Sequence, residues 1–206
     1  MNWLHRAWEA IDYRFIRGPR GGGKPVPQEF LDREYRSGAW DHFWGEDEKN
    51  RHLVLTETIL ATPGTFSLLD LGCGSGRLAS MIPAERVSDY LGVDLSEEGL
   101  AKSRALGLGH CQFLRANYES WNPERAWNFI VFNESLGYAV DPAATARRFH
   151  RHLAPGGRLL VSHFRWGNHA AFWKRLGQSF TFPVSREVAN PQGQIWDIRE
   201  LQAPGP

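Results

Sequence analysis

The sequence predicts an α/β fold in which helices cover both faces of a mostly parallel, doubly wound sheet, and three observations indicate it. Residues 68–71 form an apolar run that leads directly into a glycine-rich stretch and then a helical pattern. This order is typical of a buried strand, a tight turn and the start of a helix. A second apolar run, residues 90–93, ends in an acid. Further apolar runs alternate with helical segments along the chain, as in α/β proteins.

The glycine-rich stretch after the first strand predicts a ligand-binding loop. Gly72, Gly74 and Gly76 are spaced two apart, and glycine lets the backbone approach a ligand because it has no Cβ. Asp94 follows Gly72 by 22 residues, a position suited to accept hydrogen bonds from a ribose. Asp70 would repel a pyrophosphate but suits a cationic amino-acid group, so we expect a nucleoside without a diphosphate. The alternative is that the glycines serve only close strand–helix packing.

Four motifs together resemble the class I S-adenosylmethionine-dependent methyltransferases. They are the glycine loop at 68–79, the acidic motif at 92–96, a fourth-strand motif at 129–134 and a helix-to-strand turn at 153–162. The resemblance extends to small bacterial members, including nodulation-type N-methyltransferases and enzymes that modify sugars or secondary metabolites. It implies a Rossmann-like sheet of seven strands whose last strand is antiparallel.

Composition limits the classes of function. A net charge of +1 gives no field that would attract nucleic acid or an acidic membrane, and no Asn-Pro-Pro-Tyr motif for gripping a flipped base is present. Cys73 and Cys111 form neither a disulfide framework nor a zinc site, and we expect no metal cofactor. No apolar run is long enough to span a bilayer, and the N-terminus lacks the apolar core of a signal peptide. We therefore expect a cytoplasmic protein.

Residues 1–62 are predicted to form an N-terminal helical cap on a core at 63–206. Residues 2–16 show helical spacing of apolar side chains and should dock on the domain or close over its mouth; association with a membrane surface is the alternative. Residues 18–27 are rich in glycine and proline and read as a flexible linker, either a flap over the substrate or a plain disordered segment. Acidic residues begin a helix predicted over 46–60.

The core elements follow in order. Ser96 caps a helix that runs to residue 106, and Asp141 caps a helix that runs to residue 153. Strands are expected at 112–114, 127–132 and up to residue 162, followed by a short helix at 168–176. A turn at 190–193 separates two extended segments, which predict the final antiparallel hairpin.

The resemblance implies which residues hold the cofactor. Arg51 would bind the methionyl carboxylate, although a solvated helix charge is the alternative. Asn117 stands where the family has an aspartate that accepts from the adenine amino group, and Tyr118 would stack on the base or cover it. Trp40 would line the site, where aromatic faces attract a sulfonium by about 0.5–2 kcal/mol, or simply pack in the cap. The full expected set is Trp40, Arg51, Asp70, Gly72, Cys73, Gly74, Gly76, Asp94, Leu95, Asn117, Tyr118 and Asn133.

The expected reaction is methyl transfer from S-adenosylmethionine, giving S-adenosylhomocysteine, to N or O of a small acceptor such as an amino sugar, a glycan precursor or a secondary metabolite. Glu134 and His163 are the candidate bases. Glu134 could instead bind an ammonium group or satisfy backbone amides, and His163 could be structural. The alternatives are an O- or C-methyltransferase acting on a carrier- or nucleotide-linked intermediate, and a non-catalytic cofactor-binding regulatory domain. A homodimer is also left open.

Overall fold

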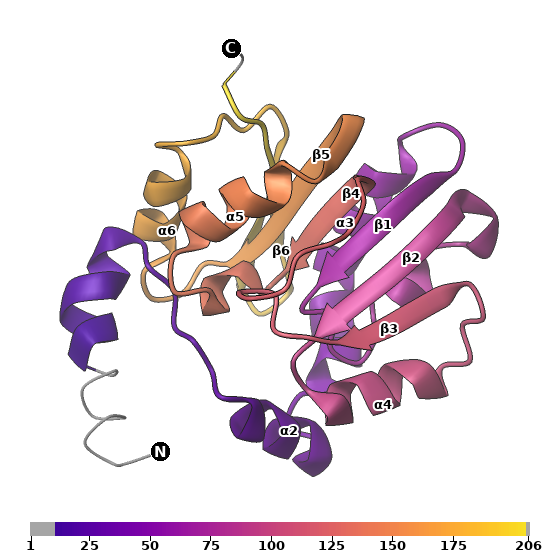
Figure 1. The fold of residues 1–206 in the computed structure, drawn as a ribbon. Coiled ribbons are helices and arrows are strands. Elements are labelled where there is room, and N and C mark those ends of the chain that lie inside the picture. The colour runs from indigo at the N-terminus through magenta and orange to yellow at the C-terminus, as the bar shows by residue number, and fades with distance from the viewer. Residues whose placement is uncertain (1–10, 205–206) are drawn as a thin grey trace.

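The computed structural model describes residues 11–204 and contains one seven-stranded sheet with the strand order β3-β2-β1-β4-β5-β7-β6 (Figure 1). Strands β1 to β5 pair in parallel, whereas β7 is antiparallel to both β5 and β6. The predicted doubly wound sheet with an antiparallel last strand is therefore confirmed. The strands are β1 (Phe66–Leu71), β2 (Val87–Asp94), β3 (Cys111–Arg115), β4 (Trp127–Asn133), β5 (Leu153–Phe164), β6 (Ser185–Ala189) and β7 (Ile195–Leu201).

Alternation along the strands divides the core between the two faces of the sheet. Leu69 and Leu71 of β1 belong to a cluster that includes Phe149 and Phe172 from the helices on one face. Leu68 belongs to a second cluster, together with Leu55 and Ile59 of the helix on the other face. Successive side chains of a strand point to opposite faces, so the apolar residues of β1, which is buried along its whole length, fill both clusters.

The helices match the predicted positions, with two corrections. The α-helices are α2 (Gln28–Ser37), α3 (Glu46–Leu60), α4 (Glu97–Ala105), α5 (Pro142–His150) and α6 (His169–Leu176). A short π-helix spans Tyr13–Arg17, and short 3₁₀ helices span Gly18–Arg20, Asp41–Trp44, Ala79–Met81, Ala84–Arg86 and Leu136–Tyr138. Ser96 and Asp141 cap α4 and α5 by accepting backbone N–H bonds, as predicted. The helix expected directly after the glycine loop is wrong: turns and a 3₁₀ helix at Ala79–Met81 stand there, and Pro83 follows two residues later, where it disfavours a longer helix. The helix expected to reach residue 153 ends at His150.

The N-terminal segment passes close to the carboxyl ends of the strands on its way from α6 to α2 (Figure 1). The amide of Asn168 donates to the carbonyls of Gly18 and Gly22 at 3.1 and 3.0 Å. A Cβ on Gly23 would lie 2.1 Å from the carbonyl oxygen of Ala139, so only glycine fits there. Residues 18–24 therefore contact the core. The mobility predicted for 18–27 and the division into cap and core stay predictions.

The predicted amphipathic helix over residues 2–16 lies mostly outside the described residues. From Tyr13 the chain forms a π-helical turn, and the Tyr13 hydroxyl donates to Asn168. Within residues 11–204, none of the helices combines the length and the apolar character needed to cross a membrane.

Candidate active site

The glycine loop follows β1 in a conformation that favours glycine. Gly72, Gly74 and Gly76 have φ values of 76°, 54° and 80°, in the region where a Cβ is disfavoured. A Cβ on Gly72 would lie 2.3 Å from the Ser135 Cβ, and one on Gly74 would lie 2.2 Å from the Tyr35 hydroxyl. The glycines thus serve the packing of the protein itself, in addition to any ligand.

The two acids predicted beside the loop are both buried. Asp94 accepts the backbone N–H of Gly74 at 2.8 Å and that of Ser96 at 2.7 Å, and burial raises its pKa. Tyr90 donates to one oxygen of Asp70 at 2.7 Å. The other oxygen of Asp70 has no hydrogen-bond partner among residues 11–204. Burial raises the pKa of Asp70 to about 7, against the opposing effect of the Tyr90 bond.

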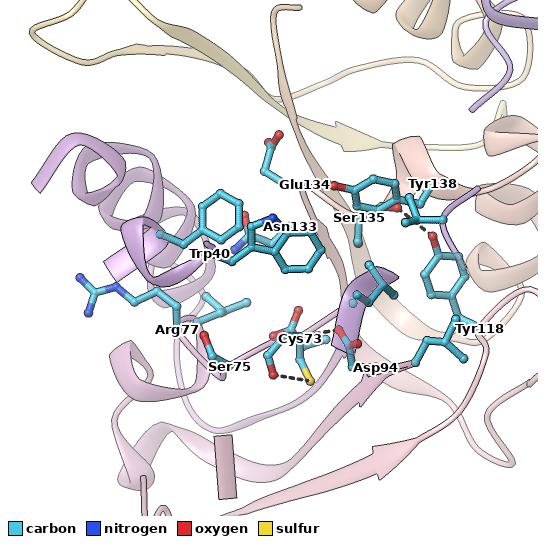
Figure 2. A pocket seen from close by; sticks show the side chains of 18 of the residues that line it. Trp40, Cys73, Ser75, Arg77, Asp94, Tyr118, Asn133, Glu134, Ser135 and Tyr138 are labelled. Carbon is cyan, nitrogen blue, oxygen red and sulfur yellow. Dashed lines mark hydrogen bonds between the residues drawn. The ribbon is translucent and has the colours of Figure 1, made fainter. Parts of the chain in front are cut away.

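A single cavity joins the loop to the carboxyl ends of β2 and β4 and to the cap. Figure 2 shows Asp94 and Cys73 on one side, with Asn133, Glu134 and Tyr138 across from them. Gly76 does not line the cavity; it packs against α4, where its Cβ would lie 2.9 Å from the Ser103 Cβ. The expected cofactor residues that line the cavity are Trp40, Arg51, Asp70, Gly72, Cys73, Gly74, Asp94, Leu95, Asn117, Tyr118 and Asn133.

The two residues expected at the nucleobase are held by local bonds. The Asn117 side-chain oxygen accepts the Glu119 N–H at 2.9 Å; a carbonyl oxygen has a second lone pair for another donor. The Tyr118 hydroxyl donates to the Ser135 carbonyl at 2.7 Å, and its ring packs edge-on against Phe132. Tyr118 is thus a fixed wall of the cavity.

Arg51 is a buried residue, so its interpretation as a solvated helix charge is wrong. Its side chain is only 3% exposed and pairs with Glu48 through Nε. Its Nη1 donates to the Asn133 side-chain oxygen at 2.7 Å. Glu48 therefore neutralises the charge of Arg51, and Arg51 in turn fixes the amide of Asn133. The nitrogen of that amide lies 3.3 Å from Nδ1 of His52.

Glu134 lines the cavity in a conformation that is rare for a residue with a side chain. Its φ is 61°, a backbone strain that often accompanies functional sites. One carboxylate oxygen accepts the Phe164 N–H at 2.9 Å, and the other lies 2.7 Å from the Ser162 hydroxyl. The expectation that Glu134 satisfies a backbone amide thus agrees with the geometry, and its place at the cavity leaves it available to an acceptor.

The structure does not bring His163 into the cavity. Its ring stacks on Phe172 with centroids 4.0 Å apart and meets Trp173 edge-on. Burial lowers its pKa. Its Nε2 is buried without a partner among the residues that the structure describes. This surrounding of apolar rings agrees with the structural interpretation of His163.

Tyr35, from the same aromatic segment as the expected wall residue Trp40, also lines the cavity. It is 7% exposed and lies against the glycine loop and Trp40. His52 and Arg77, which also line the cavity, were missed by sequence reasoning. His52 stands next to Arg51 and Arg77 directly follows Gly76, so proximity to a predicted site residue was the available signal.

The strand order and the cavity at the carboxyl ends of the strands are those of a Rossmann-like fold of the methyltransferase type. Residues 28–203 match the family described as "Methyltransferase domain", and the chain belongs to that family. It is 35% identical over 118 residues to a trans-aconitate 2-methyltransferase of Acidovorax ebreus, covering 56% of this chain and 45% of the relative. An Escherichia coli enzyme of the same name is 37% identical over 96 residues, 45% of this chain and 36% of the relative. The matches thus span less than half the length of these curated relatives.

Solved structures share the fold at low sequence identity. The N-methyltransferase NodS from Bradyrhizobium japonicum, in complex with S-adenosyl-L-homocysteine, has a TM-score of 0.71 at 18% identity, covering 86% of this chain and 98% of NodS. The 1,6-didemethyltoxoflavin-N1-methyltransferase of Burkholderia thailandensis has a TM-score of 0.70 at 19% identity, covering 86% and 87%. The fold implied by the sequence motifs is therefore confirmed.

Proposed function

We propose that this chain transfers a methyl group from S-adenosylmethionine to N or O of a small-molecule acceptor. The observation that carries the proposal is the single cavity that joins the glycine loop and Asp94 to Asn133 and Glu134. Membership of the methyltransferase family supports the reaction type. The relatives are named for trans-aconitate, and the structural neighbours include N-methyltransferases, which supports a small acceptor.

The residues present fit the cofactor. The oxygen of buried Asp70 that has no partner within the described residues 11–204 suits a cationic amino group. Asp94 has lone pairs left for ribose hydroxyls beside the two N–H bonds that it accepts. Asn117 and Tyr118 would adjoin the nucleobase. When bound, the cofactor supplies a methyl group activated by a sulfonium, and the protein holds the acceptor in line with it; proximity and orientation of this kind lower barriers strongly.

Glu134 is proposed to position the acceptor. Its carboxylate is held by Phe164 and Ser162, so it can bind an acceptor ammonium or hydroxyl without itself reorganising. An acceptor carboxylate is already a nucleophile and needs no base, whereas a hydroxyl must lose a proton, which Glu134 would take. His163 lies outside the cavity and is not assigned this role.

The test is a turnover assay with the purified chain. We expect S-adenosylhomocysteine to form only when an acceptor is added. In a panel containing trans-aconitate and an amino sugar, the mass of the product shows which acceptor is methylated, and the ¹³C NMR shift of the transferred methyl group separates O- from N-methylation. Methylation found only in the carrier-bound or nucleotide-linked fraction of a cell extract would favour the alternative acceptor class. Cofactor binding without turnover in any extract would contradict the proposal and favour a regulatory domain. A cytoplasmic location and a homodimer stay predictions.

A further inference from the structure

The lining of the cavity includes two buried side-chain nitrogens that lack partners among residues 11–204. Nε2 of His52 and Nε of Arg77 make no hydrogen bond within residues 11–204. Both residues line the cavity. Buried polar groups in native proteins are nearly always paired, because an unpaired one has lost its bonds to water. The two residues are also near each other, since the charge of Arg77 lowers the pKa of His52. Two unpaired nitrogens in one cavity indicate that a ligand supplies their hydrogen-bond partner.

The hydrogen-bond pattern identifies His52 Nε2 as a donor. An arginine nitrogen only donates, so the Asn133 atom that faces Arg51 Nη1 at 2.7 Å is the amide oxygen. The amide nitrogen of Asn133 then faces His52 Nδ1 at 3.3 Å, and Nδ1 accepts. Burial, with the nearby charges of Arg51 and Arg77, lowers the pKa of His52 to about 2. The ring is therefore neutral, and its single hydrogen is on Nε2.

Arg77 supplies the positive charge in this part of the cavity. Its guanidinium lies 4.9 Å from the centre of the Trp44 ring, and Trp44 is anchored by its own bond to Ser75 at 2.8 Å. Arg51 is neutralised by Glu48, whereas no ion pair within residues 11–204 includes Arg77. Figure 2 shows Arg77 at the edge of the cavity, with its guanidinium pointing outward from the other labelled residues. Its charge is nevertheless close enough to His52 to lower the pKa of that ring.

We propose that Arg77 and His52 form a carboxylate subsite in the cavity. A carboxylate has two oxygens and accepts charge-assisted bonds from both donors, which leaves neither nitrogen without a partner. Arg51, the residue expected for a carboxylate, is already committed to Glu48 and Asn133. The inference rests on the proposed function. The carboxylate belongs either to the methionyl part of the cofactor or to the acceptor, and the experiment separates the two.

The first arm measures cofactor binding by isothermal titration calorimetry. The proteins are wild type, Arg77→Gln, His52→Phe and, as a matched loss of charge outside the cavity, Arg147→Gln on α5, whose side chain bonds Ser179. If the carboxylate is the cofactor's, both cavity variants raise the Kd for S-adenosylhomocysteine at least tenfold. Their Kd for 5′-methylthioadenosine, which lacks the amino-acid part, stays within twofold of wild type. Arg147→Gln changes neither value.

The second arm measures an added carboxylate in the protein loaded with S-adenosylhomocysteine, with tricarballylate as the probe. If the carboxylate is the acceptor's, the cavity variants keep their affinity for S-adenosylhomocysteine but weaken tricarballylate binding at least tenfold. The subsite is overturned if neither ligand distinguishes folded Arg77→Gln or His52→Phe from wild type. Failure of wild type to bind S-adenosylhomocysteine would instead overturn the proposed function.

A measurement on wild type covers the case in which a variant does not fold. Long-range ¹H–¹⁵N NMR should show His52 as the neutral ring with its hydrogen on Nε2, and the Nε2 resonance should shift when the carboxylate ligand binds but not with 5′-methylthioadenosine. A ring with its hydrogen on Nδ1, or an Nε2 resonance unmoved by both carboxylate ligands, would contradict the subsite. Arg77→Lys, which keeps the charge without the Nε donor, should recover only part of the affinity.

Discussion

The two halves of the cavity are built in different ways. In the half beside Asp94, backbone N–H groups of the glycine loop and of the β2–α4 turn are bonded to one carboxylate. In the half beside Asn133, side chains from α3, β4 and β5 bond to one another. The first half therefore depends on contiguous motifs, and the second depends on side chains that only the tertiary fold brings together.

This difference predicts that the halves can be damaged separately. Loss of a side chain in the Asn133 half should spare the binding of a nucleoside without an amino-acid group. Loss of Asp94 should weaken every ligand that contains adenosine. The predictions below use 5′-methylthioadenosine and S-adenosylhomocysteine as the pair of ligands that distinguishes the halves.

The largest effect on stability is expected for Arg51→Met. The substitution leaves Glu48 buried without its cation, and breaking a buried pair on one side costs about 3–5 kcal/mol of unfolding free energy. Urea denaturation measures it. The double variant with Glu48→Gln should recover more than half of the loss, and the folded fraction should still bind 5′-methylthioadenosine. A double variant no more stable than the single one would show that the pair is not the cause.

Asp94→Ala should produce the largest loss of affinity. It removes the acceptor for the Gly74 and Ser96 N–H groups and the proposed partner of the ribose. Losing charge-assisted bonds of this kind should raise the Kd of both ligands by about 100-fold, or about 2.7 kcal/mol. Asp89→Ala on the same strand is the control, since Asp89 pairs with Arg125 at the surface. Unchanged binding of 5′-methylthioadenosine would place the ribose elsewhere.

Gly74→Ala separates conformational strain from steric conflict. Its Cβ would meet the Tyr35 hydroxyl, and the positive φ adds about 1 kcal/mol of strain. Gly64→Ala has a similar φ of 74° with no atom within 4 Å of its Cβ, so it measures the strain alone. We expect Gly74→Ala to lower the unfolding free energy by about 1–2 kcal/mol more than Gly64→Ala, and Tyr35→Phe to restore part of the difference. Equal losses for the two alanine variants would exclude the steric conflict.

The Asp94 half of the cavity could be predicted from the sequence more fully than the Asn133 half. The strand–loop–strand motif is local, so apolar runs and glycine spacing were enough to predict β1, β2 and the position of Asp94. The prediction of a helix start after the glycine loop is wrong, because the chain between Gly76 and Pro83 forms only turns and a 3₁₀ helix at Ala79–Met81. The antiparallel hairpin was predictable from its turn at 190–193 and its alternation.

The Asn133 half could not be predicted in detail. Arg51 and Asn133 are 82 residues apart in the chain, and no periodicity within α3 shows which of its polar residues is buried. Glu48, Arg51 and His52 are all less than 10% exposed, although charged residues on a helix ordinarily face water. Gly23 contacts residues 137–140, which are more than 110 positions away in the chain. Because only the tertiary fold brings them together, these contacts could not be predicted from the sequence.

Glu134→Gln tests whether the Asn133 half includes the acceptor position. The new side chain has an NH₂ group in place of one carboxylate oxygen. If the NH₂ faces the Phe164 N–H, that hydrogen bond is lost; if it faces the acceptor, the acceptor meets a donor where the wild type offers an oxygen. We expect kcat to fall at least tenfold while the Kd for S-adenosylhomocysteine changes by less than twofold, measured by a turnover assay and calorimetry. Glu124→Gln, at an exposed position, is the control. Parallel losses of turnover and of cofactor affinity would exclude Glu134 from the acceptor position.

The smallest expected effect is a pH dependence of affinity that belongs to Asp70. Burial raises the pKa of this carboxyl to about 7, so it is mostly protonated at pH 6 and mostly ionised at pH 8. Only the ionised form attracts the cationic amino group, and the Kd for S-adenosylhomocysteine should therefore fall several-fold between these values, which calorimetry at each pH measures. 5′-Methylthioadenosine has no amino group and should show no such change. Asp70→Asn should bind S-adenosylhomocysteine with a flat profile; a slope that persists in this variant would assign the titration to another group.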